Sequence, residues 1–313
     1  MIKKKIEVVI LSSNRPYFLI QAIKSALRAK NRVRRLVDCK LIVSDNSDDE
    51  SCIKHIKKLN VNNDIIIRSI RSKLDIFNHF KKVISEASSD YIIIFHDDDI
   101  MKSNFIEDLY LTIDNHPDCI AAASNGIYID ELGRGHGNLW GGKFTDHHYK
   151  KMSSDELFEA YFSYGSHGIC PFPGYIYRTK LIKNKGLDYS KGGKYSDVSF
   201  LYDLTKLGSI LWINKVGMEY RRHSNNDSNS IILDEQISLL RYLKSENYNN
   251  VHLRDFRFRI WLNWLLYQKK QIKINLNYRL ITVTKYIISS LITKYIWNYK
   301  FILYIYNKII TNK

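Results

Sequence analysis

The chain has few of the residues that build thiolate metal sites, tight turns and membrane spans. Its four cysteines form no CxxC pair, so a thiolate-bound metal is not expected and a reducing, cytosolic compartment is favoured. Proline (4) and glycine (14) are scarce among the 313 residues. No run of about 18 uncharged apolar residues occurs, which disfavours a membrane-spanning helix. The absence of GxxxxGK(S/T) and GxGxxG motifs also disfavours a P-loop kinase and a dinucleotide-binding enzyme.

Acidic residues are missing from the end of the chain, where none follows Asp255. The formal net charge of +16 is concentrated there, because residues 231–313 hold 14 Lys and Arg against 4 Asp and Glu. Within this region, residues 256–313 combine 11 Lys or Arg with 13 aromatic residues. Such an imbalance indicates an anionic partner for this part of the chain.

Three interpretations of residues 256–313 are open. Trp and Tyr among cations are typical of a segment that lies on an anionic membrane surface, and we favour that partner. A helical extension packed on the rest of the protein would explain the same pattern. Basic residues interleaved with aromatics also suit single-stranded nucleic acid. Nothing in the first 230 residues supports that interpretation, so no nucleic acid is expected as a partner.

Apolar runs with strand and helix periodicity alternate through the first 130 residues. Five runs are predicted as strands: 7–13, 39–49, 64–70, 91–96 and 119–130. Four amphipathic segments between them are predicted as helices: 16–30, 51–59, 75–87 and 105–117. This alternation predicts an α/β fold with a mostly parallel central sheet. Ligands of such sheets collect at the carboxyl ends of the strands. Three of those ends carry polar clusters: SSNR (12–15), SDNSDD (44–49) and HDDD (96–99).

The later part of the chain has weaker signals. Residues 131–149 are rich in glycine and aromatics and are predicted to form a loop or hairpin. Further helices are predicted over 153–165 and 197–208, and further strands over 172–182 and 208–214. The pattern after residue 230 is mostly helical. We therefore expect a domain over 1–230, followed by a basic, helical C-terminal region over 231–313.

The stretch YIIIFHDDDI, residues 91–100, places three adjacent carboxylates directly after an apolar strand. Asp97, Asp98 and Asp99 repel one another, and burying them costs further free energy. A helix N-cap would explain one or two of these residues, but three are harder to explain in that way. The pattern favours a divalent cation that is held by carboxylate oxygens together with a diphosphate.

Several segments, in order along the chain, resemble the sequence motifs of glycosyltransferase family 2. They are VVILSSNRP near the N-terminus, IVSDNSDDES after the second predicted strand, YIIIFHDDDI after the fourth, and the later pair YSDVSFLYDLTKLG and YRRHSNNDS. Their order and spacing match the family from about residue 5 to residue 230. The resemblance implies a GT-A nucleotide-sugar-binding domain and an inverting, metal-dependent sugar transfer.

The resemblance also implies a metal site. Asp98 is the implied Mn²⁺ or Mg²⁺ ligand, Asp99 extends the motif, and His223 completes the site. Asp97 is implied to reach the ribose or to support the metal. His96 is either a further participant or a buried, hydrogen-bonded histidine.

Other positions are implied to contact the donor. Asp45 resembles the acid that reads the nucleobase or the ribose, although an Asx turn after the strand would also explain it. Arg221, together with Arg222, would offset the charge of the diphosphate. The remaining implied contacts come from the first strand end and from a helix that faces the sugar: Ser12, Asn14, Arg15 and Asn78.

Asp197 is implied to be the general base, which takes the proton of the acceptor hydroxyl during inverting transfer. Its neighbours Ser196 and Val198 depart from the family pattern, which has Glu before the acid and an aromatic residue after it. A helix N-cap is the structural alternative for Asp197. Asp203, which lies inside the same predicted helix, is the rival base.

The implied reaction moves a sugar from a nucleotide-sugar, with a UDP-sugar as the expected donor, to a hydroxyl of a saccharide. A lipid-linked oligosaccharide at the inner face of the plasma membrane is the expected acceptor, because members of the family often use such acceptors and because the C-terminal region is basic. Two alternatives remain open. A nucleotidyltransferase also combines an α/β sheet, acids and a metal, and a non-catalytic membrane or nucleic-acid adaptor would use the scaffold without turnover.

Overall fold

The computed structural model of the chain describes residues 3–260, apart from 62–63, 71, 140–148, 163–169, 225, 227–229 and 248–249. The strands are β1 (Lys5–Ser12), β2 (Asp38–Asp45), β3 (Ile65–Ser69), β4 (Tyr91–His96), β5 (Ile100–Met101), β6 (Cys119–Ile129), β7 (Gly135–Leu139), β8 (Tyr149–Met152), β9 (Tyr175–Arg178) and β10 (Ser209–Arg221). The helices are α1 (Pro16–Val33), α2 (Ser51–Lys57), α3 (Ile76–Glu86), α4 (Phe105–Asp114), α5 (Ser154–Phe162), α6 (Thr179–Ile182), α7 (Ser196–Thr205) and α8 (Leu233–Glu246). Short 3₁₀ turns are η1 (Phe172–Gly174), η2 (Tyr189–Lys191) and η3 (Gly193–Tyr195), and a further helical segment covers 251–260.

One mixed sheet organises the fold, with the strand order β3-β2-β1-β4-β9-β6-β10-β5. β1 pairs in parallel with both β2 and β4, β2 pairs in parallel with β3, and β6 pairs in parallel with β10. β7 and β8 add antiparallel pairs to β6 and β10. The predicted α/β fold with a mostly parallel sheet is confirmed, and helices follow the final strand.

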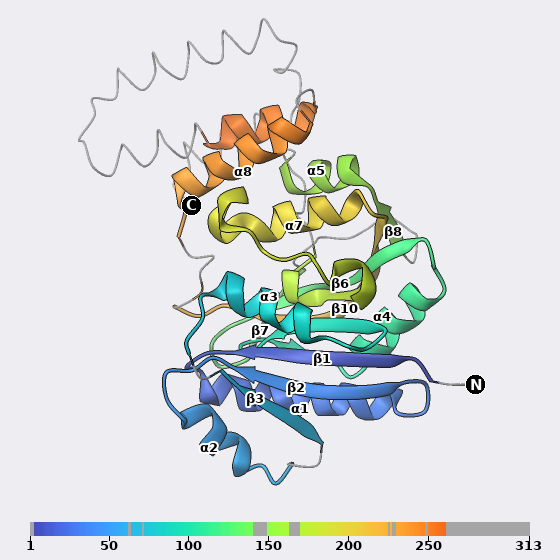
Figure 1. Ribbon diagram of the computed structural model, residues 1–313, viewed down its shortest axis with the longest axis vertical. Coiled ribbons are helices and arrows are strands. Elements are labelled where there is room, and N and C mark those ends of the chain that lie inside the picture. Colours follow the sequence, from blue (N-terminus) through green and yellow to red (C-terminus); the bar gives the residue numbers. More distant parts are fainter. Residues whose placement is uncertain are drawn as a thin grey trace, which may run out of the picture.

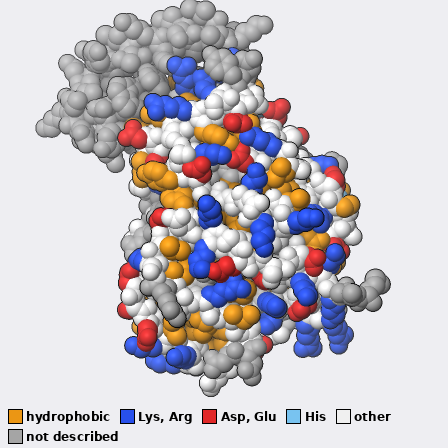
Figure 2. Space-filling model, in the orientation of Figure 1, with side chains coloured by type: hydrophobic (Ala, Val, Ile, Leu, Met, Phe, Trp, Pro, Cys, Tyr) orange, Lys and Arg blue, Asp and Glu red, His pale blue; other side chains and the backbone are white. Residues whose placement is uncertain are grey.

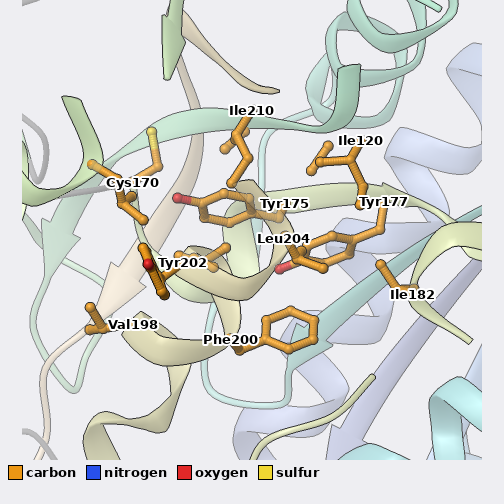
Figure 3. Close-up of a cluster of buried hydrophobic side chains, with 14 of the residues drawn as sticks. Ile120, Cys170, Tyr175, Tyr177, Ile182, Val198, Phe200, Tyr202, Leu204 and Ile210 are labelled. Carbon is orange, nitrogen blue, oxygen red and sulfur yellow. The ribbon is translucent and has the colours of Figure 1, made fainter. Parts of the chain in front are cut away.

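Helices cover both faces of this sheet (Figure 1). Val8 and Ile10 of β1 pack on one face with α1, α2 and α4, whereas Val9 and Leu11 pack on the other with α3, α5, α7 and α8. Alternate side chains of a strand point to opposite faces, so a strand that is covered on both sides must be apolar throughout. That requirement explains the continuous apolar runs of the sequence. Figure 3 shows part of the second face, where Tyr175, Tyr177 and Phe200 are buried together.

Two local start signals act as expected. Pro16 lies in the first turn of α1, where its missing N–H group is not needed. Ser153 and Glu156 form the capping box before α5, because the Ser153 backbone N–H donates to Glu156 Oε2 at 2.8 Å. In return the Glu156 N–H donates to Ser153 Oγ at 3.5 Å.

The segment 172–182, which was predicted as a strand, divides into η1, the short strand β9 and α6. β9 lies antiparallel between β4 and β6. The Arg178 guanidinium fixes this position by donating to the backbone carbonyls of Ile113, His116 and Cys119, at the end of α4 and the start of β6. Apolar periodicity carries no information about strand direction, so the sequence did not indicate this insertion.

β10 continues to Arg221, beyond its predicted end at residue 214. Register shifts on either side of Val216 bend the strand without ending its pairing with β6. The last part of β10 also pairs with β5, where Met218 lies opposite Met101. The segment 131–149 was predicted as a loop or hairpin. Its strand β7 pairs antiparallel with the preceding strand β6, and 140–148 lie outside the described residues.

α8 and the segment 251–260 pack on the same core as the sheet. Leu239, Leu243 and Phe256 are buried in one cluster with side chains of α5 and α7. The Phe256 ring stacks on Phe162 with 4.4 Å between ring centroids. The membrane contact predicted for 256–313 concerns residues that, beyond 260, lie outside the described part of the chain, and it stays a prediction. Within the described part, no helix is both long and apolar enough to cross a membrane.

Leu243→Ala tests whether α8 belongs to the same folding unit as the sheet. Leu243 is fully buried, so its truncation should lower the free energy of unfolding by about 2–5 kcal/mol. We expect one calorimetric transition at a lower Tm. The control Leu207→Ala removes a leucine that is 48 % exposed and should change the Tm little. Two separate transitions, one of them at the wild-type Tm, would instead indicate an independent unit over 231–313.

Candidate active site

The carboxyl ends of three neighbouring strands meet at one edge of the sheet. Parallel pairing places Ser12, the last residue of β1, opposite Asp45, the last residue of β2. It also places Leu11 opposite His96 at the end of β4. The aspartate loop, Asp97–Asp99, follows β4 directly and leads into β5. The three polar clusters of the sequence are therefore neighbours in space, as parallel pairing requires.

The aspartate loop is buried and is held by a cation of the protein. Asp97 is 0 % exposed, Asp98 6 % and Asp99 1 %. The Arg15 guanidinium bridges the first two, with Nη2 at 2.6 Å from Asp97 Oδ1 and Nη1 at 2.6 Å from Asp98 Oδ2. The Ser13 backbone N–H donates to Asp97 Oδ2 at 3.0 Å. Arg15 was predicted to contact the donor, and the structure places its side chain at the carboxylates of the aspartate loop.

The end of β10 holds the aspartate loop from the other side. The Arg221 backbone N–H donates to Asp99 Oδ1 at 2.9 Å, and its side-chain Nε donates to the Asp98 carbonyl at 2.8 Å. His223 Nε2 lies 3.0 Å from Asp98 Oδ2. Phe18 on α1 packs beside both residues, with its ring centroid 4.8 Å from the Arg221 guanidinium carbon and 5.2 Å from the His223 ring centroid.

Arg221 is fully buried, and its guanidinium group is hydrogen-bonded to other groups of the protein. Nη1 donates to the carbonyls of Asp130 and Glu131, and Nη2 donates to Gln21 Oε1 on α1. Contact with a diphosphate would require these hydrogen bonds to break. The arrangement therefore favours a positioning role for Arg221 over the predicted contact with the donor. Phe18 and Gln21 were not predicted, since both stand at ordinary positions of an amphipathic helix and no motif marks them.

Burial acts against the negative charge of the loop. Burial and the charge of Asp98 hold the pKa of Asp99 well above its usual value. Burial would raise the pKa of Asp98 as well, but Arg15, His96 and His223 keep that pKa below its usual value. A divalent cation would relieve this accumulation of buried negative charge.

The loop offers ligand atoms for a divalent metal ion. One such atom from each of His96, Asp98 and Asp99 lies within 4.8 Å of the other two. Asp99 Oδ2 is buried and has no hydrogen-bond partner among the described residues, which is costly unless a cation binds there. Carboxylates suit Mg²⁺, and a mixed imidazole and carboxylate set suits Mn²⁺. These residues fit the predicted metal, and their geometry favours His96 as a further participant in the site. His223 instead contacts the Asp98 oxygen that Arg15 also binds.

The predicted donor contacts at the first two strand ends lie side by side. Asn14 has a left-handed backbone with φ of 58°, and its side chain accepts from the Asp48 N–H at 2.9 Å. Asp45 is buried and accepts from the Ser47 hydroxyl at 2.6 Å. The Ser12 hydroxyl points toward Cys52 Sγ, 3.6 Å away.

Asn78 lies in the first turn of α3 and is exposed. Its backbone N–H and its side-chain amide both donate to the N-cap residue Asp75, at 2.8 and 2.7 Å. These bonds give Asn78 a local role at the helix start. Its predicted contact with the sugar stays a prediction.

Asp197 lies in the first turn of α7 and is partly buried. The Val198 N–H donates to its Oδ1 at 2.9 Å. Burial raises the pKa of Asp197 to about 6. Burial also raises the pKa of Tyr161 and of Tyr177, and the nearby Asp197 carboxylate adds to both shifts. Among the described residues, no hydrogen bond or ion pair joins Asp197 to the aspartate loop.

Asp203, the alternative candidate for the general base, forms ion pairs and a hydrogen bond with other side chains. Lys191 and Lys206 lie 2.9 and 3.0 Å from its two oxygens, and the Tyr242 hydroxyl donates to it from α8. Burial would raise its pKa, but these hydrogen bonds hold the pKa below its usual value. An acid that is stabilised in its charged form is a weak proton acceptor. The geometry therefore favours a structural role for Asp203, tying α7 to α8.

A mixed sheet covered on both faces, with buried carboxylates at the carboxyl edge that fit a divalent ion, is the arrangement of a GT-A sugar transferase. The sequence model for glycosyl transferase family 2 matches residues 7–182. The chain belongs to glycosyl transferase family 2, whose members transfer a sugar from a nucleotide-sugar donor. The search of curated proteins finds no match.

Solved structures of a bacterial enzyme share this fold. S. aureus TarS 1-349 in complex with UDP-GlcNAc has a TM-score of 0.56 at 12% identity, over 80% of this chain and 69% of that one. The complex of S. aureus TarS 1-349 with UDP has a TM-score of 0.54 at 13% identity, over 77% and 71%. A longer S. aureus TarS chain has a TM-score of 0.52 at 14% identity, with 77% of this chain covering 43% of that one.

Asp98→Ala tests the aspartate loop as the metal site. We expect Mn²⁺ to bind the variant much more weakly in calorimetry, and the affinity for nucleoside diphosphate in the presence of Mn²⁺ to fall with it, because a ligand is lost. The fold should survive, since Arg15 keeps its ion pair with Asp97 and the repulsion among the carboxylates falls. Glu50→Ala, which removes an exposed acid, serves as the control. Equal Mn²⁺ and nucleotide affinities in Asp98→Ala and wild type would remove Asp98 from the site.

Proposed function

We propose that the protein is an inverting, metal-dependent glycosyltransferase that moves a sugar from a UDP-sugar to a hydroxyl group of a saccharide. The observation that carries this proposal is the buried aspartate loop, where Asp99 Oδ2 lacks a partner in the described part of the chain. The proposed ligands are Asp98 and Asp99, together with His96 or His223. A divalent ion held there would offset the charge of the departing diphosphate.

Asp197 is the proposed general base. The acceptor hydroxyl gives its proton to Asp197 while its oxygen bonds to the anomeric carbon of the donor sugar. The bond between that carbon and the diphosphate oxygen breaks, and its electron pair leaves with the nucleoside diphosphate. A pKa of about 6 suits a base that works near neutral pH. The Val198 N–H holds Oδ1, which leaves Oδ2 to accept the proton.

The donor assignment has two supports. A solved structure with the same fold, S. aureus TarS 1-349, is a complex with UDP-GlcNAc. In this chain, Asp45 ends β2 beside Ser12 and Asn14, where a carboxylate can accept from a uracil N–H or a ribose hydroxyl. Arg15 lies between this group and the aspartate loop and would meet the diphosphate there.

The acceptor is proposed to be a saccharide carried on a lipid at the inner face of the plasma membrane. The support is the composition of residues 256–313, which hold 11 Lys or Arg, 13 aromatic residues and no acid. The reaction itself is assigned to residues 1–230. Leu239 and Leu243 of α8 are buried in their core.

A donor panel tests the reaction. The full chain is incubated with several nucleotide-sugars and saccharide acceptors, with and without Mn²⁺, and the released nucleotide is measured. We expect a UDP-sugar to release UDP in the presence of Mn²⁺ and much less in its absence. Release of pyrophosphate would instead identify a nucleotidyltransferase. No turnover of any donor with any acceptor would favour the non-catalytic adaptor.

Asp197→Asn separates a general base from a helix cap. Asn keeps the shape and caps about as well as Asp, but it cannot accept a proton at neutral pH. Single-turnover transfer should fall by about 10²–10⁴-fold, while Mn²⁺ and donor affinities and the Tm change little. In wild type, transfer should fall as the pH drops below about 6, because the base becomes protonated, and the variant should lack this acid limb. Near-normal transfer in Asp197→Asn would leave only the capping role.

A further inference from the structure

A basic hollow lies at the C-terminal end of α1, away from the aspartate loop. Its volume is about 540 Å³. The hollow is lined by Arg28, Asn31, Arg32, Arg34, Arg35 and Ser103. Arg15 and the aspartate loop lie at the other end of α1, which is 18 residues long. At 1.5 Å per residue, the two ends are about 27 Å apart. The arginines of the hollow are therefore far from Arg15, whereas Ser103 follows Asp99 by only four residues.

Every lining side chain offers hydrogen-bond donors, and no carboxylate lines the hollow. Four of the chain's 16 arginines are gathered here, although lysine is twice as frequent in the sequence. The planar guanidinium donates two parallel hydrogen bonds to phosphate oxygens, which an ammonium group cannot do. The use of arginine instead of lysine therefore favours direct hydrogen bonding to phosphate groups over a general electrostatic attraction for anions.

Little of this positive charge is neutralised by the protein. Arg32 pairs with Glu107. Within the described residues, no ion pair is formed by Arg28, Arg34 or Arg35, all of which are exposed. Lys3 adds a further cation, because its Nζ donates to the Arg34 carbonyl at 2.9 Å. In Figure 2, Lys and Arg side chains gather at the lower right, near the start of the chain and the end of α1.

The backbone around the hollow is fixed. The N–H groups of Leu36 and Val37 both donate to the Val33 carbonyl and close the turn that carries Arg34 and Arg35. Ser103 also lines the hollow, two residues before the first residue of α4. The first turn of α4 carries Glu107 and Asp108, so the attraction for an anion at the hollow rests on the arginines and not on the helix dipole.

We propose that this hollow is a second anion site, which binds phosphate groups of a ligand other than the sugar donor. The chemistry is shared by a free phosphate ion and by the phosphate of a phospholipid headgroup. The site is independent of the proposed transfer reaction. The competing explanation is that basic residues merely stabilise the end of a helix through its dipole.

The charge-reversal pair Arg34→Glu/Arg35→Glu is the test, and Lys57→Glu/Lys58→Glu is its matched control. Both pairs are exposed neighbours at the C-terminal end of a helix, so both change the net charge by the same amount and place acids at a helix end. The wild type and all variants retain residues 256–313, so any contribution of that region to binding is the same in each. One arm measures inorganic phosphate binding by calorimetry without divalent metal. The other arm measures flotation with phosphatidylglycerol and phosphatidylcholine vesicles at low and high salt.

We expect Arg34→Glu/Arg35→Glu to lose at least about tenfold in affinity in one arm, and the control to lose less than about twofold. A loss with phosphatidylglycerol vesicles alone assigns the site to headgroups, and a loss with inorganic phosphate assigns it to a single phosphate group. Equal losses in both variants, unchanged binding in both, or no binding by wild type would overturn the proposal. If the double variant melts early, Arg28→Gln, with an expected loss of about fivefold, decides the question.

Discussion

Three carboxylates buried side by side need positive charge and N–H groups on every side, and the candidate site is arranged around that need. Arg15 approaches from the start of α1, and Arg221 and His223 approach from the end of β10. These groups come from two distant parts of the chain, so the electrostatics of one short loop tie α1, β4 and β10 together. The protein groups satisfy Asp97 and Asp98 but leave one oxygen of Asp99 without a partner in the described chain. That imbalance is what a metal-binding loop requires.

The two aspartates of α7 show how surroundings divide the roles of identical side chains. Asp197 lies among tyrosines and receives one backbone N–H bond, so burial dominates and its pKa rises to about 6. Asp203, two turns along the same helix, is surrounded by Lys191, Lys206 and Tyr242, so its charge is stabilised. Burial thus raises the pKa of one carboxylate, whereas ion pairs and hydrogen bonds lower the pKa of the other.

The sequence indicated those features that arise from local pattern. The aspartate loop could be found because acids directly after an apolar strand conflict with burial, and parallel pairing then places Ser12, Asp45 and His96 at one edge. The roles of Arg221 and Phe18 could not be found in this way, because they depend on contacts across about 200 positions of the chain. The insertion of β9 was also hidden, since the same apolar pattern serves a strand of either direction.

The antiparallel β9 has a consequence for the order of folding. β4 and β6 hydrogen-bond to β9 and not to each other, so the sheet is continuous only after Tyr175–Arg178 have been inserted between them. A nascent chain can complete β3, β2, β1 and β4 early, since their pairing needs only the first 96 residues. It then exposes an apolar edge of β4 until the later strand arrives. Contacts this distant in sequence form slowly because closing the intervening loop costs entropy. The docking of β9 should therefore be a late step of folding, and so should the pairing of β10 with β5, which brings Arg221 to the aspartate loop.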